Sequence, residues 1–231
     1  MMKKNIVLIA SILLSFLLLI LVSLSAFYFN YNKPENIFDR NISKVVEIKV
    51  SNDNVNWGYA TGCFIDPNGN ILTNKHVVFN QSTNTNYSQI FVRLATSEEF
   101  IPAEIKKISN EHDLAIININ LKNNDYFNIN NSINDGEEIY TIGNPNGFGL
   151  SFTSGLISSA NRNVIYNERV ISAMQTDLVI NEGNSGGPVF SKNGDLKGII
   201  SFRLRDNKND IISGVSFAIP AKFILEFINL I

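Results

Sequence analysis

The residues of this chain best suited to covalent chemistry lie in one glycine-framed turn, Asn181-Glu182-Gly183-Asn184-Ser185-Gly186-Gly187-Pro188. A serine hydroxyl is a poor nucleophile unless a neighbouring base takes its proton and nearby N–H groups bind the developing oxyanion. Glycine lets the backbone curl closely around a bound carbonyl. We therefore predict that Ser185 is a nucleophile and that the N–H groups of Gly183 and Ser185 form an oxyanion hole. Taken alone, the string also fits a glycine-rich hairpin turn with an incidental serine.

The chain has two histidines, and His76 is the better candidate for a general base. It lies in Thr73-Asn74-Lys75-His76-Val77-Val78, which is typical of a strand end running into a short helical turn. Histidine suits proton transfer near neutral pH, and an acid must hold its tautomer. Asp113 is predicted for that role because it opens an apolar run. His112 precedes it on the same strand and should face away, in a packing or surface role.

The order His76, Asp113, Ser185 is that of chymotrypsin and differs from the orders in subtilisin and the α/β-hydrolases. Residues 183–187 also match the G-x-S-x-G nucleophile elbow of those hydrolases as a string. The elbow joins a strand to a helix, whereas Pro188-Val189-Phe190 continues as a strand. This argues against a hydrolase of that class.

With these segments in place, the chain resembles the HtrA/Deg family of trypsin-fold serine endopeptidases over residues 43–227. The resemblance rests on residues 61–65, 69–78, 113–115, 142–147, 153–158, 175–177 and 216–220. It implies an all-β fold of two six-stranded barrels, with His76 and Asp113 from the first barrel, Ser185 from the second, and the site in the cleft between them. It also implies proteolysis of unfolded or damaged exported proteins, as in protein quality control.

Four features depart from the patterns of related proteases. Glu182 replaces a usual proline, which predicts a looser turn or a more acidic rim, and Cys63 replaces a small residue. Asn184 replaces the aspartate of digestive trypsins, so it cannot pair with a freed N-terminal amine, and no proteolytic zymogen activation is expected. The sequence ends at Ile231 after a helix-like stretch, residues 221–230, so we expect a catalytic domain without the family's PDZ domain.

The predicted specificity pocket is apolar. In a trypsin fold the residue six before the nucleophile lines the pocket base, and here it is Val179, followed by Ile180. Valine cannot select Arg or Lys as an aspartate does. Ile200 and Ser201 are expected beside the substrate backbone, and Phe217 along another wall. This predicts cleavage after small or medium aliphatic residues.

Two alternatives to that pocket stay open. Val179 and Ile180 could be core residues of a strand, with the pocket formed elsewhere. Glutamyl endopeptidases of the staphylococcal type share the string Thr-Asn-Lys-His-Val-Val, so specificity for an acidic side chain is the competing prediction. Cleavage of peptides that differ only at this position would separate the two.

The N-terminus predicts a membrane segment. Residues 6–29 contain no charge and no proline, and as a helix they would span about 36 Å, enough for a hydrocarbon core of about 30 Å. We predict a signal anchor over residues 1–30, a tether over 31–42 and the protease domain over 43–231. Lys3 and Lys4 would stay in the cytoplasm and the catalytic domain would lie outside. The alternative is secretion after cleavage of a signal peptide near Ser23-Leu24-Ser25.

Composition limits the remaining functions. The net charge of −2 gives no sign of nucleic-acid binding, and one cysteine cannot form an intrachain disulfide. The sequence contains no His/Cys cluster of the kind that holds a metal ion. It also contains no phosphate-binding fingerprint of a nucleotide cofactor. Short apolar or alternating runs predict strands at residues 44–50, 90–94, 114–119, 138–142, 170–175 and 196–202.

The resemblance also bears on the partners of this chain. Members of the resembling family often form trimers through N-terminal segments, so a homo-trimer is one assembly that the resemblance implies. The rival function is a membrane-tethered, non-catalytic chaperone or binding scaffold. It is less favoured because His76, Asp113 and Ser185 are all present.

Overall fold

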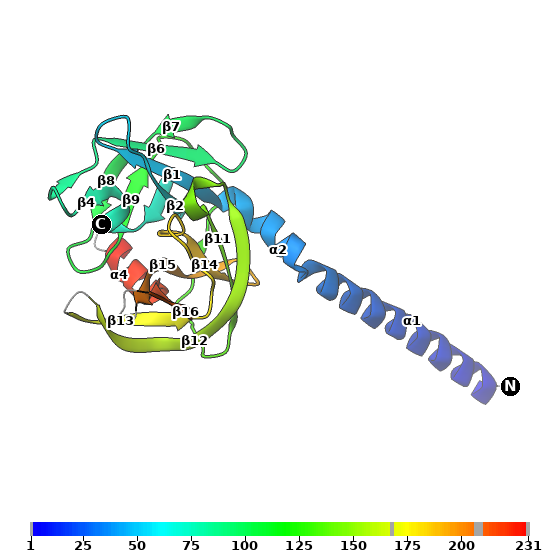
Figure 1. The fold of residues 1–231 in the computed structure, drawn as a ribbon. Coiled ribbons are helices and arrows are strands. Elements are labelled where there is room, and N and C mark those ends of the chain that lie inside the picture. The colour runs from blue at the N-terminus through cyan, green and yellow to red at the C-terminus, as the bar shows by residue number, and fades with distance from the viewer. Residues whose placement is uncertain (1, 167–168, 206–209, 230–231) are drawn as a thin grey trace. The chain divides into compact units, whose positions relative to one another are not determined.

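The computed structural model describes residues 2–166, 169–205 and 210–229, and the chain divides into the units Met1–Asp39 and Arg40–Ile231 (Figure 1). The first unit is mostly the helix α1 (Met2–Tyr31). Its stretch Leu8–Tyr31 has a mean hydropathy of 2.8 and is not buried. A helix of this length and composition can cross a bilayer or serve as a signal sequence.

A second helix, α2 (Pro34–Asn41), forms most of the segment predicted as a tether. This segment shows no clear apolar periodicity. Helix formation is nevertheless favoured there, because Pro34 occupies the first turn, Glu35 lies near the positive end of the helix dipole and Arg40 near the negative end. The division between the two units falls within α2 and not after it.

The first barrel is a sheet in the order β7-β6-β1-β2-β3-β9-β8. Its strands are β1 (Val45–Ser51), β2 (Gly58–Phe64), β3 (Asn70–Thr73), β6 (Gln89–Leu94), β7 (Phe100–Pro102), β8 (Glu104–Ile108) and β9 (Ala115–Asn118). Only Ala103 separates β7 from β8, and its N–H donates to the Ile90 carbonyl at 2.9 Å. One bent segment therefore pairs with β6 and then with β9, which closes a barrel of six strands.

The second barrel is the sheet β10-β15-β14-β11-β12-β13-β16, closed by pairing of β15 with β16. Its strands are β10 (Asn128–Ile129), β11 (Glu138–Gly143), β12 (Ser151–Tyr166), β13 (Arg169–Thr176), β14 (Pro188–Ser191), β15 (Asp195–Arg205) and β16 (Ile211–Pro220). Six strands form the ring, and the short β10 adds in parallel to β15. The long β12 curves along this barrel (Figure 1).

Short elements complete the fold. They are the 3-10 turns η1 (Ile42–Lys44) and η2 (Pro145–Gly147), the helix α3 (Lys75–Val78), the hairpin β4 (Phe79–Asn80) with β5 (Thr85–Asn86), and the helix α4 (Ala221–Asn229). One face of α4 is apolar, and Ala221, Ile224 and Phe227 are buried along it. The helix predicted at the C-terminal end is confirmed, although Leu230 lies outside the described residues. The all-β double barrel is also confirmed.

Each barrel has its own hydrophobic core. In the first barrel Ile48, Phe64 and Ile71 are fully buried within one cluster. In the second barrel, Ile139, Met174 and Val189 are likewise fully buried within one cluster. Burial of such side chains stabilises a fold by about 1.5–3 kcal/mol each. The two cores fix the barrels as rigid walls on which loops can position reactive groups.

Candidate active site

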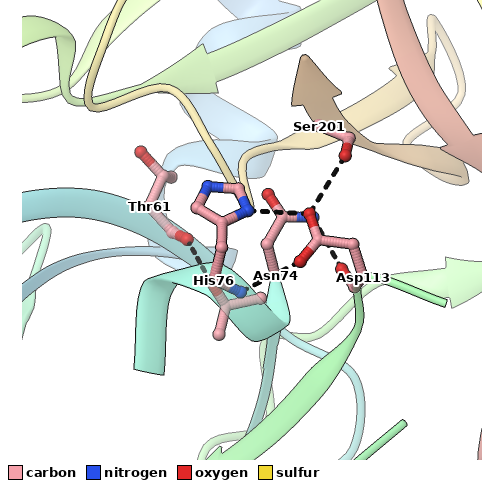
Figure 2. Close-up of polar contacts among 6 residues, drawn as sticks. Thr61, Asn74, His76, Asp113 and Ser201 are labelled. Atoms are coloured by element: carbon pink, nitrogen blue, oxygen red, sulfur yellow. Dashed lines mark hydrogen bonds and ion pairs between the residues drawn. The ribbon is translucent and has the colours of Figure 1, made fainter. Parts of the chain in front are cut away.

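His76 and Asp113 are joined by two hydrogen bonds (Figure 2). His76 lies in α3, directly after the end of β3, and Asp113 lies two residues before β9. The ring nitrogen Nδ1 of His76 is 2.7 Å from Asp113 Oδ2, and the His76 backbone N–H donates to Asp113 Oδ1 at 2.9 Å. Because β3 and β9 are paired neighbours, the short connections after β3 and before β9 lie side by side.

Two further residues hold the Asp113 side of this pair. Ser201 Oγ donates to Asp113 Oδ2 at 3.1 Å, and Asn74 Nδ2 donates to the Asp113 backbone carbonyl at 2.9 Å (Figure 2). Ser201 belongs to β15, so this contact joins the second barrel to the first. The Asp113 carboxylate thus accepts three hydrogen bonds, which hold it beside the His76 ring.

The same pair sets the protonation of His76. Burial lowers the pKa of His76, but the hydrogen bond and the negative charge of Asp113 outweigh burial, so the pKa lies above its ordinary value. An imidazole with a raised pKa is a stronger base once deprotonated. His112 has a different role, since its ring stacks on Phe223 of α4 with the centroids 4.3 Å apart. The predicted packing role of His112 agrees with this contact.

The backbone around Ser185 is fixed by backbone hydrogen bonds. The carbonyl of Glu182 accepts from the Asn146 N–H at 2.7 Å, and the N–H of Asn184 donates to the Asn181 carbonyl at 3.0 Å. Gly183 has φ +93, and a Cβ there would lie 2.1 Å from the Asn144 carbonyl oxygen. Only glycine fits this position without displacing the backbone.

Thr61 of β2 fastens this turn to the first barrel. Its hydroxyl donates to the Gly183 carbonyl at 2.7 Å and accepts from the Asn144 N–H at 2.9 Å. Its own N–H donates to the Ser185 carbonyl at 3.0 Å. The Thr61 side chain is fully buried, so these bonds are shielded from water.

This network leaves two N–H groups unused. Within the described ranges, the N–H groups of Gly183 and Ser185 donate no hydrogen bond, whereas those of Asn184, Gly186 and Gly187 do. The carbonyl before each unused N–H is itself hydrogen-bonded. The Glu182 carbonyl, before Gly183, accepts from the Asn146 N–H, and the Asn184 carbonyl, before Ser185, accepts from the Gly187 N–H. Two free N–H donors in a tight turn can bind an oxyanion.

His76, Asp113 and Ser185 line one open cleft of about 810 Å³, with residues of both barrels on its walls. Ser185 is partly exposed there. In the part of the chain that the structure describes, no hydrogen bond joins Ser185 Oγ to the His76 ring. Such contacts are often long before substrate binds. Among the same residues, no group of three or more His, Cys, Asp or Glu side chains could hold a metal ion.

A sequence model of the trypsin-like peptidase domain matches residues 60–199. The chain belongs to the trypsin-like peptidase family. A probable periplasmic serine endoprotease DegP-like of Hahella chejuensis is 34% identical over 171 residues, which cover 73% of this chain and 34% of that protein. The mitochondrial serine protease HTRA2 of Drosophila erecta is 33% identical over 174 residues, covering 73% and 38%. The chain therefore spans about a third of the length of these relatives.

Solved peptidase structures share the fold. The HtrA-type protease AlgW with tripeptide has a TM-score of 0.73 at 29% identity, covering 85% of this chain and 62% of that one. The serine endoprotease from Yersinia pestis has a TM-score of 0.69 at 28% identity, covering 86% and 66%. These matches confirm the resemblance to HtrA/Deg proteases that the sequence motifs indicated.

Not every residue predicted for the peptidase specificity pocket lies there. Ile180, Ile200 and Ser201 line the cleft, as predicted. Val179 does not, and its side chain is 68% exposed on the segment between β13 and the nucleophile turn. Phe217 is 1% exposed and stacks on Phe202 with the centroids 4.9 Å apart, so it belongs to the core. Val179 thus does not line this cleft and Phe217 is a core residue, so neither supports the predicted apolar pocket.

Sequence reasoning missed three residues that shape this site: Thr61, Asn74 and Arg203. Thr61 and Asn74 stand inside motifs that carried the resemblance, but their contacts cross between segments and give no periodic signal. Arg203 lines the cleft from β15, two residues beyond Ser201. A basic residue so close to the predicted substrate strand was a usable signal.

Proposed function

We propose that this chain is a serine endopeptidase that hydrolyses peptide bonds through an acyl-enzyme on Ser185. The observation that carries the proposal is the 2.7 Å contact between His76 Nδ1 and Asp113 Oδ2, in the same cleft as Ser185 and its two unused N–H groups. A general base, an acid that orients it, a nucleophilic serine and an oxyanion site are together the groups that acyl transfer requires.

The first half of the reaction forms the acyl-enzyme. His76 Nε2 takes the hydroxyl proton as Ser185 Oγ attacks the peptide carbonyl, and Asp113 stabilises the imidazolium that results. The N–H groups of Gly183 and Ser185 bind the oxyanion of the tetrahedral intermediate. The imidazolium then gives its proton to the leaving amine, and the C–N bond breaks.

The second half releases the product. A water molecule attacks the ester carbonyl while His76 takes one of its protons. Collapse of the second tetrahedral intermediate breaks the C–O bond to Ser185, which recovers its proton from His76. Loss of one oxyanion donor costs about 2.7–4 kcal/mol in comparable sites, so the bonds that fix Gly183 bear directly on the rate.

The natural substrates proposed are unfolded or damaged exported polypeptides. The support is the similarity to a protein described as a probable periplasmic serine endoprotease. The sequence-based preference for aliphatic residues loses its main support, because it rested on Val179 and Phe217. Ile180 and Ile200 still supply apolar surface to the cleft.

We also propose that α1 anchors the protein in the cell membrane, with the catalytic domain on the outer side. Its exposed apolar stretch, Leu8–Tyr31, is long enough to span the bilayer, and Lys3 and Lys4 precede it. Alkaline extraction of membranes should leave the protein in the pellet, and protease added to intact cells from which any outer barrier has been removed should degrade it. Recovery of a shorter, soluble form would show signal cleavage instead.

The activity is tested with full-length protein in detergent and unfolded casein. Ser185→Ala should lower casein cleavage by about 10⁴-fold or more without changing the unfolding transition. Ser82→Ala, at an exposed serine in the loop between β4 and β5, is the matched control and should match the unmodified protein. Undiminished cleavage by the Ser185 variant would contradict the assignment.

The second candidate, a non-catalytic binding scaffold, predicts a different result. A scaffold without a nucleophile should bind unfolded casein but should not react with a fluorophosphonate probe. The buried turn and its two unused N–H groups favour the enzyme.

A further inference from the structure

Arg203 joins two segments of the second barrel that line the cleft. Its Nη1 donates to the Ile180 carbonyl at 2.9 Å and to Asn181 Oδ1 at 3.2 Å. Ile180 and Asn181 belong to the segment that leads into the nucleophile turn, whereas Arg203 belongs to β15. All three residues line the cleft. The guanidinium is therefore held across the space beside the proposed catalytic groups.

Strand β15, which carries Arg203, is bonded directly to the nucleophile turn. The N–H of Gly186 donates to the Ile200 carbonyl at 3.0 Å, and the N–H of Ile200 donates to the Gly187 carbonyl at 2.9 Å. The start of this stretch of β15 is thus fastened directly behind Ser185. Further along β15, Arg203 Nη1 lies 2.9 Å from the carbonyl of Ile180, which belongs to the segment that leads into the turn of Ser185.

The charge of Arg203 has no anionic partner in the described part of the chain. Both groups that it contacts are neutral amide oxygens, and the ion pairs found there join other residues. Its Nε and Nη2 donate to no group among the same residues. A guanidinium has five N–H donors in a planar fork, so a free edge remains for a carboxylate.

The other charged groups on the cleft are placed differently. Lys75 Nζ donates to the Ser109 carbonyl at 3.2 Å, at the first-barrel side. Glu182 is exposed on the rim, where water screens its charge, and it forms no ion pair with Arg203. Arg169 lies on the cleft from β13. Arg203 is partly buried, and its Nη1 is bonded to both Ile180 and Asn181, so its guanidinium is held on the segment that leads to Ser185.

Apolar surface accompanies this charge. Ile180 and Ile200 are 6% and 1% exposed, and both line the same cleft. A glutamate side chain has two methylene groups followed by a carboxylate, which matches an apolar passage that ends at a guanidinium. An aliphatic side chain would leave the guanidinium without its counter-ion.

We propose that Arg203 is the specificity-determining residue of this peptidase, and that it binds the carboxylate of a glutamate on the acyl side of the cleaved bond. This rests on the proposed function, because only an enzyme that forms the acyl-enzyme at Ser185 has an acyl-side pocket. It replaces the aliphatic preference that the sequence predicted through Val179.

The test compares four peptides that differ only at that position: Glu, Gln, Val and Lys. With the full-length protein in detergent, we expect kcat/KM for Glu to exceed that for Gln by tenfold or more. Glutamine has the same shape without the charge, so this ratio isolates the contact with Arg203. At 1 M salt the ratio should fall, while cleavage of the Val peptide should stay constant, because salt screens the ion pair.

Variants separate binding of the substrate carboxylate by Arg203 from a purely structural role, in which Arg203 only holds Ile180 and Asn181 in place. Arg203→Gln should bring the Glu-to-Gln ratio close to one and leave cleavage of the Gln and Val peptides within threefold. Arg203→Glu should turn the preference toward Lys. Arg169→Gln is the matched control, since it removes another arginine of the cleft, and it should keep the Glu preference. If Arg203 had only a structural role, its replacement would instead lower kcat/KM for all four peptides equally.

The outcomes also separate this inference from the proposed function. A protein that a fluorophosphonate labels at Ser185, but that cleaves the Glu and Gln peptides equally, overturns the inference alone. The same follows if Arg203→Gln keeps the Glu preference. If no peptide is cut and the probe does not react, the proposed function fails and the inference fails with it.

Discussion

The two sides of the cleft differ in how completely their polar groups are paired. On the His76 side, Asp113 accepts three hydrogen bonds to its carboxylate and one to its backbone carbonyl. On the opposite side, Arg203 contacts only neutral oxygens. The first side is preorganised for chemistry before substrate arrives, whereas the second has a charge that substrate can neutralise. In the proposed roles, reaction and selection depend on different side chains of the cleft, and each can be disturbed separately.

The largest expected effect comes from breaking the His76–Asp113 pair. Asp113→Asn keeps the shape of the side chain but cannot hold the same His76 tautomer or stabilise its cation. We expect kcat to fall by about 10⁴-fold, with the Glu-to-Gln preference of any residual activity unchanged. Steady-state kinetics on the peptide panel would check this. Activity within tenfold of the unmodified enzyme would contradict the role of Asp113.

A smaller effect is expected at Thr61, which joins the walls through the nucleophile turn. Thr61→Val removes the hydroxyl that bonds Gly183 and Asn144, and leaves both buried groups without a partner, at about 1–3 kcal/mol each. We expect kcat to fall by about tenfold or more, and the urea midpoint to fall as well. Thr61→Ser keeps the hydroxyl and is the control. Equal activity of the Val and Ser variants would show that the turn holds its shape without these bonds.

The smallest effect concerns pH. Because the pKa of His76 is raised, the imidazole stays protonated, and inactive as a base, up to a pH above its ordinary value of about 6.5. The acid limb of kcat/KM should therefore have its midpoint above 6.5, and Asp113→Asn should move it down. A midpoint below 6.5 in the unmodified enzyme would contradict the effect of Asp113.

The same shift has a consequence for stability. A pKa that is higher in the folded than in the unfolded protein stabilises the fold below the unfolded value, and this contribution is lost as pH rises through the folded value. The His76–Asp113 pair should therefore stabilise the protein more in weak acid than at alkaline pH. Replacing His76 by Gln should reduce the difference between unfolding midpoints at these two conditions.

The sequence predicted the fold well where local patterns determine structure. Runs with an alternating or apolar pattern became strands close to the expected bounds, such as β11 (Glu138–Gly143) for residues 138–142. The long β12 was anticipated only at residues 153–158, because its polar and asparagine-rich sequence, with mostly exposed or half-buried residues, lacks an apolar signal. The helix α2 was missed because its sequence has little apolar content.

The candidate site divides in the same way. His76, Asp113 and Ser185 could be selected from short motifs, because the types of residue needed for acyl transfer are few. The pocket residues could not be selected so reliably. Whether Val179 points into the cleft or into solvent, and whether Arg203 reaches Ile180, depends on how two distant strands pack. No local pattern encodes that contact.

The central claim is that Ser185 is activated by the His76–Asp113 pair, and covalent labelling tests it most directly. Full-length protein in detergent is treated with a fluorophosphonate probe, and the adduct is mapped by mass spectrometry. We expect a single adduct on Ser185, formed much more slowly in His76→Ala and at an unchanged rate in Ser82→Ala. No adduct on Ser185, or equal labelling after loss of the His76 imidazole, would contradict the account.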